Sequence, residues 1–258
     1  MLPEITNPGT YFPHLEGFAH RRLIDGAAAP WDAVARISRY LEEEIARARS
    51  VLPNRALEGL EVRDRSLGRG ETLLVARGLV EVPEAVLVAG AGVVLGAGVV
   101  LEPGSLIKAP AIIGAGTEVR HGAYLRGDVL VGERCTIGHA TEVKNSVFMD
   151  HAEAGHFAYV GDSILGSYVN LGAGTKLANL RLRRRADKLS GTFPPLSLRF
   201  GKETVPAGVP KLGAVLGDHC ETGCNSVTTP GVFCGAGCWI YANATVKQGY
   251  YPPRSVIR

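Results

Sequence analysis

The chain has 258 residues, including 33 glycines, 28 lysines or arginines and 25 aspartates or glutamates. A formal net charge of +3 is too balanced to indicate nucleic acid or an anionic membrane as the main partner, and no basic-then-apolar signal segment opens the sequence. The apolar run at residues 86–101 is too short and too rich in glycine to span a membrane. We therefore expect a cytoplasmic protein.

Residues 1–80 are expected to form an N-terminal appendage that contains one helix. The helix is expected at about residues 30–50, because apolar residues recur there at helical spacing, and Pro53 follows its end. The residues on its apolar face are Trp31, Val34, Ile37, Leu41 and Ile45.

An aliphatic or methionine residue recurs at every sixth position over the next part of the chain. A period of six fits neither an amphipathic helix nor an alternating strand, but it is typical of a parallel β-helix built from hexapeptide repeats. The position two residues earlier is mostly small, as the interior of a narrow coil requires. The sequence therefore predicts a mainly β coil over residues 81–258. The ten residues are Leu95, Leu101, Ile107, Ile113, Val119, Leu125, Val131, Ile137, Val143 and Met149.

Two breaks in this period predict inserted loops. The first is expected at about residues 150–159, after which the period resumes out of phase. The second is expected at about residues 181–210, and it contains Arg181, Arg183, Arg184, Arg185 and Lys188. Loops that interrupt a regular scaffold often carry function. The basic cluster fits a solvated loop and a phosphate-binding loop equally well.

Four of the five cysteines form two C-x3-C pairs, Cys220 with Cys224 and Cys234 with Cys238. Zinc sites more often have two intervening residues. Cys220 and Cys238 fall on the small inward position of the repeat, so we interpret them as residues that fill the coil.

A group of charged residues suggests a functional site. If three hexapeptides close one turn, Arg126 and Lys144, which are 18 positions apart, stack on one face. Two stacked cations fit a phosphate or carboxylate site, and they also fit two solvated side chains. Glu142 lies two residues before Lys144, and His156 lies in the first predicted loop, where it could serve as a general base at neutral pH.

Several spaced motifs resemble one known family over about residues 90–250. The motifs are His156-Phe157-Ala158-Tyr159-Val160-Gly161-Asp162-Ser163, Asn170-Leu171-Gly172-Ala173-Gly174-Thr175, Ala178-Asn179-Leu180, Lys211-Leu212-Gly213, Leu216-Gly217-Asp218, Thr222-Gly223-Cys224-Asn225 and Pro230-Gly231-Val232. They resemble the C-terminal β-helix domain of the sugar-1-phosphate nucleotidylyltransferases, in particular the bifunctional enzymes that are also glucosamine-1-phosphate N-acetyltransferases. No glycine-rich loop followed by Thr-Arg and Lys is found, so we expect the nucleotidylyltransferase domain to be absent.

The resemblance implies a left-handed β-helix that forms a homotrimer with sites between subunits. It implies an N-acetyltransferase that uses acetyl-CoA and an amino-sugar 1-phosphate, and that needs no metal. By the same resemblance, His156 is the general base, Glu142 orients it, and the backbone N–H of Ala173 stabilises the oxyanion.

The binding residues also follow from the resemblance. The acceptor contacts are Arg126, Lys144, Tyr159, Asn170 and Lys211. The CoA contacts are Asn179, Cys224 and Ala242.

Two other functions remain open at this stage. The first is a zinc enzyme like the γ-class carbonic anhydrases, suggested by Arg126-Gly127-Asp128 and by His151 and His156, with His121 or His139 as a third ligand. The second is a non-catalytic trimerisation module that binds a sugar phosphate.

Overall fold

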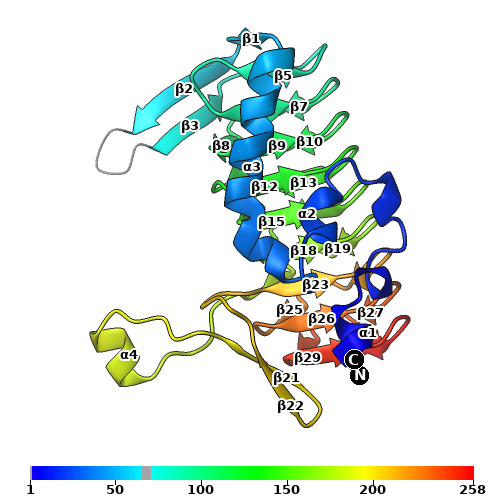
Figure 1. Cartoon of the computed structure of the whole chain (residues 1–258). Coiled ribbons are helices and arrows are strands. Elements are labelled where there is room, and N and C mark those ends of the chain that lie inside the picture. Colours follow the sequence, from blue (N-terminus) through cyan, green and yellow to red (C-terminus); the bar gives the residue numbers. More distant parts are fainter. Residues whose placement is uncertain (1, 66–70) are drawn as a thin grey trace.

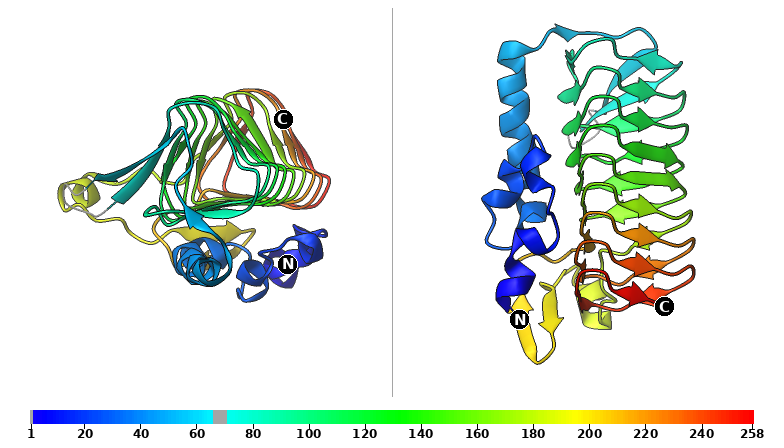
Figure 2. Two further views of the ribbon diagram at one scale, coloured as in Figure 1. Left: turned by 90° about the horizontal axis from the view of Figure 1, so that it is seen from above. Right: turned by 90° about the vertical axis from the view of Figure 1, so that its right-hand side faces the viewer.

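The chain folds into a triangular coil with one β-sheet along each of its three faces (Figure 1). The computed structural model describes residues 2–65 and 71–258. Seen along its axis, the coil is a prism of stacked turns, with helices against one face (Figure 2). The predicted fold class, a mainly β, left-handed parallel β-helix of hexapeptide repeats, is confirmed.

From β6 onward the chain visits the three sheets in the order A, C, B. Sheet A contains β1 (Asn54–Arg55), β5 (Val86–Val88), β6 (Val93–Leu95), β9 (Ala111–Ile113), β12 (Val129–Val131), β15 (Ser146–Phe148), β18 (Ile164–Leu165), β23 (Ala214–Leu216), β26 (Val232–Cys234) and β29 (Gly249–Tyr251). Sheet C contains β4 (Val80–Glu81), β7 (Val100–Leu101), β10 (Glu118–Val119), β13 (Thr136–His139), β16 (Glu153–His156), β19 (Asn170–Leu171), β24 (Glu221–Thr222), β27 (Trp239–Ile240) and β30 (Val256–Ile257). Sheet B contains β2 (Leu60–Arg65), β3 (Glu71–Ala76), β8 (Leu106–Lys108), β11 (Tyr124–Leu125), β14 (Glu142–Lys144), β17 (Tyr159–Gly161), β20 (Lys176–Leu177), β25 (Val227–Thr228) and β28 (Thr245–Val246).

The predicted inward residues fill the coil with one exception. The first nine of the ten have an exposed fraction of 0–1% and belong to the central core. Phe148, and not Met149, pairs in register with Val131 and continues the inward series. Met149 is equally buried, but it packs on the outside of the coil. The period therefore shifts one position earlier than the sequence predicted.

No loop is inserted at residues 150–159, all of which the structure describes. Strand β16 and the start of β17 occupy this stretch, and Ala154 pairs with Ile137, 17 positions earlier (154 minus 137). A turn of 17 residues instead of 18 arises at the corner between sheets B and A, where Asn145 and Asp162 adopt φ values of 47° and 49°. The change of phase thus comes from a corner shortened by one residue in two successive turns.

The first strands run against the rest of the coil. Strands β5 and β6 form an antiparallel hairpin, and β3 and β4 pair antiparallel with β8 and β7. Strands β1 to β4 therefore already belong to the three sheets of the coil, although they precede or overlap residue 81, where the sequence placed the start of the coil. The domain boundary at residue 81 stays a prediction.

The outer face of sheet A is apolar and is covered by the N-terminal part of the chain (Figure 2). Helix α3 (Asp32–Val51) runs along it, and all five predicted apolar helix residues are buried. Shorter helices continue the cover: α1 (Leu2–Thr6), the 3₁₀ turns η1 (Pro8–Thr10) and η2 (Leu15–Gly17), and α2 (Arg22–Asp25). Burial of each large apolar side chain contributes about 1.5–3 kcal/mol, so this cover fixes which face of the coil is closed to solvent.

The second predicted insertion leaves the coil after β20 and returns at β23. It carries α4 (Arg185–Leu189), which projects away from the coil (Figure 1), and a hairpin of β21 (Ser197–Phe200) and β22 (Glu203–Pro206). The Phe200 ring packs 5.8 Å from Trp31 and 5.4 Å from Phe233. Among the described helices, none is long and apolar enough to cross a bilayer.

Candidate functional site

Six residues lie one above another at the corner between sheets C and B, one from each of six successive turns. The carbonyl oxygen of each of the first five accepts a hydrogen bond from the backbone N–H of the residue that follows the next one in the column, at N···O distances of 2.8–3.2 Å. These residues are here named the corner column: His121, His139, His156, Ala173, Cys224 and Ala242. Four of the sequence-predicted site residues are therefore consecutive members of one column.

The chain turns sharply after each of the six column members. The residue directly after each member has a φ value between 51° and 77°. In chain order these residues are Gly122, Ala140, Phe157, Gly174, Asn225 and Asn243. Glycine and asparagine adopt this conformation at low cost. The column consequently runs along an edge of the prism.

The column histidines differ in their hydrogen bonds. The rings of His121 and His139 stack 5.5 Å apart, and each Nδ1 donates to a backbone carbonyl, that of Pro103 at 2.6 Å and that of His121 at 2.8 Å. The His156 ring is exposed and makes no hydrogen bond or ion pair to any described residue. Its two nitrogen atoms are therefore available to a ligand.

Glu142 contacts Arg126 and not His156. The Arg126 Nη1 atom lies 2.6 Å from Glu142 Oε1, and this hydrogen bond raises the pKa of the guanidinium. Tyr159 is the register neighbour of Glu142 on sheet B. Burial, with the nearby carboxylates of Asp162 and Glu142, raises the pKa of its phenol. The predicted pairing of Glu142 with His156 is absent from this arrangement.

Asp162 organises the other edge of sheet B. Its carboxylate is buried and accepts hydrogen bonds from Lys144 Nζ at 3.3 Å, from Asn145 Nδ2 at 2.8 Å and from Asn179 Nδ2. Two predicted ligand residues, Lys144 and Asn179, are thus bound to one carboxylate. Asp162 is a residue of this site to which the sequence motif Gly161-Asp162-Ser163 assigned no role.

Two further predicted acceptor residues lie away from the column. Asn170, on the outer face of sheet C, donates to Glu221 at 2.9 Å. The Lys211 Nζ atom lies 5.1 Å from the centre of the Phe193 ring, which Arg183 also contacts from 4.1 Å. Lys211 therefore contacts the second insertion, residues 181–210, through Phe193.

The histidines of the carbonic-anhydrase alternative lie at two different corners. His121, His139 and His156 share the corner column, whereas His151 is at the corner between sheets A and C, where its ring stacks 4.5 Å from Tyr168. Within residues 2–65 and 71–258, no three His, Cys, Asp or Glu side chains group as a metal site. This arrangement does not favour the alternative.

The cysteines follow the coil-filling interpretation. Cys220, Cys234 and Cys238 are buried inside the coil, as is Cys135, and Cys224 is exposed on the corner column.

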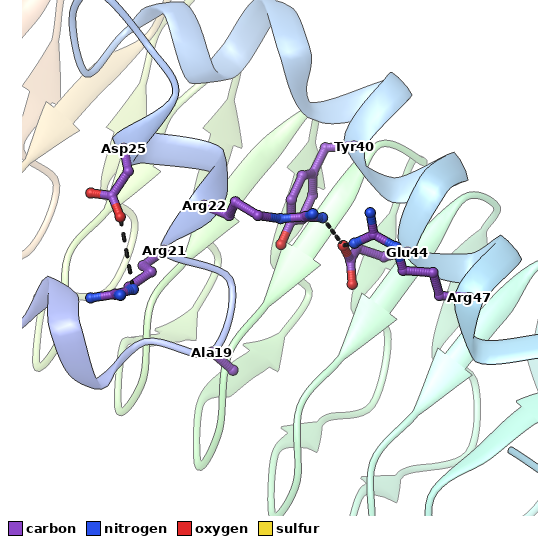
Figure 3. A pocket seen from close by; sticks show the side chains of 7 residues that line it. All are labelled: Ala19, Arg21, Arg22, Asp25, Tyr40, Glu44 and Arg47. Atoms are coloured by element: carbon purple, nitrogen blue, oxygen red, sulfur yellow. Dashed lines mark hydrogen bonds and ion pairs between the residues drawn. The ribbon is translucent and has the colours of Figure 1, made fainter. Parts of the chain in front are cut away.

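Two well-defined cavities lie outside the corner column. One of about 460 Å³ lies between α2 and α3, where Arg22 and Arg47 both contact Glu44 (Figure 3). Another of about 780 Å³ lies between the end of α3 and the β5–β6 hairpin. The arginines of the first are already paired with carboxylates, including Arg21 with Asp25 at 3.8 Å. The corner column is instead an open ridge.

The fold and the column together define a hexapeptide-repeat β-helix protein with an exposed histidine, His156, on one of its corners. Residues 107–223 match the family model described as the GMPPB C-terminal domain, and this segment contains every predicted site residue except Cys224 and Ala242. The resemblance to sugar-1-phosphate nucleotidylyltransferases is confirmed over this part of the coil.

Curated relatives align with less than half of the chain. A bifunctional sugar-1-phosphate nucleotidylyltransferase/acetyltransferase from Sulfurisphaera tokodaii is 40% identical over 116 residues, which are 45% of this chain and 27% of the relative. The bifunctional protein GlmU from Methanocaldococcus jannaschii is 36% identical over 116 residues, 45% of this chain and 26% of that protein. The matched region thus spans about a quarter of each relative. A UDP-N-acetylglucosamine acyltransferase structure from Francisella novicida has 16% identity and a TM-score of 0.34, covering 62% of this chain and 56% of that one.

Proposed function

We propose that this protein is an acyltransferase that moves the acetyl group of acetyl-CoA to the amine of an amino-sugar 1-phosphate similar to glucosamine 1-phosphate. The name of the relative with 40% identity includes both a sugar 1-phosphate and an acetyltransferase activity, which supports this class of reaction. The observation that carries the proposal is the corner column, because it sets an unpaired imidazole beside a backbone turn with a free N–H.

The chemistry requires a base and an oxyanion donor close together. An ammonium group has no lone pair, so a base must take its proton before the nitrogen attacks the thioester. His156 is the exposed imidazole suited to that step. Ala173 is on the next turn, about 4.8 Å further along the column, and its N–H has no acceptor among the described residues. This N–H can stabilise the oxyanion while His156 holds the proton.

The acceptor phosphate is expected on sheet B, beside the column. Arg126 is an exposed cation there, and its ion pair with the exposed Glu142 side chain contributes only about 0–1 kcal/mol. A phosphate can therefore replace Glu142 as the partner of Arg126. Lys144 and Tyr159 lie on the same sheet as Arg126. Asn170 is on sheet C and Lys211 is beside the second insertion, so a sugar bound at Arg126 would have to lie in another orientation to reach them.

The CoA arm is expected to follow the column away from His156. Cys224 and Ala242 are its next two members after Ala173, so a thioester carbon near Ala173 leaves the arm in their direction. Asn179 is at the far edge of sheet B, bound to Asp162, and its expected contact with CoA has the least geometric support.

An exposed ridge offers only one wall to a substrate. We therefore propose a homotrimer in which a second copy supplies the other wall, with no metal required for the transfer. Two of the three faces of the coil, sheets B and C, are free of the N-terminal cover that closes sheet A.

Release of CoA from acetyl-CoA tests this function, with glucosamine 1-phosphate and galactosamine 1-phosphate as acceptors and a chelator in a parallel reaction. We expect release that persists with chelator. His156→Ala should lower kcat by about two to four orders of magnitude, the usual contribution of a general base. His139→Ala, one turn away in the same column, is the matched control and should retain turnover within a few-fold.

Full turnover by the His156→Ala protein would exclude the proposed base. If the wild-type protein releases no CoA with either acceptor but binds the sugar phosphates, the non-catalytic module becomes the better interpretation.

A further inference from the structure

The N-terminal segment, residues 2–29, is joined to the coil at the corner between sheets A and C. Asp218 is fully buried there, and its carboxylate accepts hydrogen bonds from the backbone N–H of His14 and of Ser167, both at 2.8 Å. Its own N–H donates to the Tyr11 carbonyl at 2.7 Å. The backbones of residues 14 and 219 are therefore held in a defined relative position, although 205 residues separate them in the sequence.

Two imidazoles converge at this junction. The Nε2 atoms of His14 and His219 are 3.2 Å apart. The His219 ring stacks on Tyr168 at 4.9 Å, and the His14 ring stands nearly perpendicular to both, at 5.0 Å from His219 and 6.0 Å from Tyr168. The rings are thus oriented by their neighbours, and both histidines are exposed to solvent.

The distance of 3.2 Å between the two Nε2 atoms matches the distance between two histidine nitrogens that bind one tetrahedral metal ion. Zinc–nitrogen bonds of about 2.0–2.1 Å at a tetrahedral angle put the two nitrogens about 3.3 Å apart. We propose that His14 and His219 bind a divalent transition-metal ion of the zinc type, which fastens the N-terminal segment to the coil. In the metal-free state one Nε2–H donates a hydrogen bond to the other Nε2. When the ion binds both Nε2 atoms, that proton moves to the Nδ1 atom of its own ring, so both rings remain neutral.

The remaining positions on the ion are expected to be filled by water. No third His, Cys, Asp or Glu of the described residues groups with this pair. An open cavity of about 390 Å³ lies beside His14 and is also lined by Glu16, Asp150 and His151, so water can reach the His14 side of the pair. Two protein ligands indicate moderate affinity and a structural role.

Zinc titration of the metal-stripped full-length protein tests the site, with the bound ion measured by competition against a chromophoric chelator. We expect one zinc per chain in the wild-type protein. His14→Ala and His219→Ala should each weaken binding at least tenfold. His139→Ala removes a histidine from the other corner and should bind zinc like the wild type. Zinc should raise the wild-type Tm and leave that of the His14→Ala protein unchanged.

Cobalt supplies a readout that does not depend on affinity alone. Co²⁺ bound to the wild-type protein should show the visible absorption of a four-coordinate site, and this signal should be lost in both His14→Ala and His219→Ala. If wild-type protein binds no zinc, or if His14→Ala binds it with unchanged affinity, the proposal is wrong. Loss of binding in His139→Ala alone would locate the ion on the corner column and would equally overturn it.

Discussion

At the scale of single residues, the candidate site contains two kinds of charged group. Arg126 and Glu142 form an exposed pair, with side chains 40% and 37% exposed, and such pairs exchange partners readily. Lys144 is bound to Asp162, whose side chain is only 5% exposed. An unpaired buried carboxylate is costly, so Lys144 has a structural role in addition to any contact with substrate.

This difference predicts separate effects for the two cations. Lys144→Ala should raise the KM for the acceptor and also lower the free energy of unfolding by about 1–3 kcal/mol, because Asp162 loses a charged partner. Arg126→Ala should raise the same KM with a stability change below about 1 kcal/mol. Urea unfolding and steady-state kinetics of both variants measure this. Equal stability losses would contradict the assigned role of Asp162.

At the scale of secondary-structure elements, the spacing of strands positions the corner column. Strands β13 and β16 approach so closely at Gly138 that a Cβ there would lie 1.8 Å from the Gly155 carbonyl oxygen. A Cβ at Gly155 itself would meet no atom within 4 Å. These two glycines directly precede His139 and His156, which are register partners on the two strands, so they control how closely the backbones of the two histidines approach.

The different surroundings of Gly138 and Gly155 predict that alanine substitutions at these two positions change stability by very different amounts. Gly138→Ala should destabilise the protein by about 1–3 kcal/mol or more, because the added methyl group must push β16 away, and turnover should fall as His156 moves. Gly155→Ala should change stability by no more than about 0.5 kcal/mol, as is usual for an open position. Thermal unfolding followed by the CoA assay compares them. A Gly138→Ala protein with wild-type stability would show that the strands are further apart than described.

At the scale of the whole molecule, the cover on sheet A decides which surfaces remain available. Helix α3 and the N-terminal segment close that face, and the hairpin β21–β22 adds to the same apolar cluster. Exposed apolar residues on the other two faces and their corner include Phe157, at 54% exposed, and Trp239, at 57%. A second copy of the chain would therefore approach through sheets B and C.

This arrangement predicts the state of the protein in solution. Light scattering coupled to size exclusion should give about three times the chain mass of 27.3 kDa, and turnover should fall when dilution separates the copies, since each site would need two chains. A monomer with undiminished turnover would contradict the proposed site between subunits.

The sequence by itself determined the coil. A period of six cannot be accommodated by a helix or a flat strand, so the inward positions from Leu95 to Val143 were predictable from local pattern alone. The family resemblance selected His156, Ala173, Cys224 and Ala242 as site residues, and their functional roles stay a prediction; that they share one corner came from the structure. Outward-facing apolar residues on sheet A, such as Ile112 and Leu130, pack under the N-terminal cover, but no covered face was predicted from them.

Only the tertiary structure decided what depends on register and on distant contacts. Phe148, and not Met149, points into the coil because the preceding corner is one residue shorter than in the earlier turns. Successive side chains of a strand point to opposite faces, so a shift of one position moves a residue from the inside of the coil to the outside. Glu142 pairs with Arg126 because adjacent turns bring them within 2.6 Å, which no spacing rule reveals. His14 meets His219 because the appendage folds back along the coil. Such contacts arise from packing between segments far apart in the chain, so they cannot be predicted from the local sequence pattern.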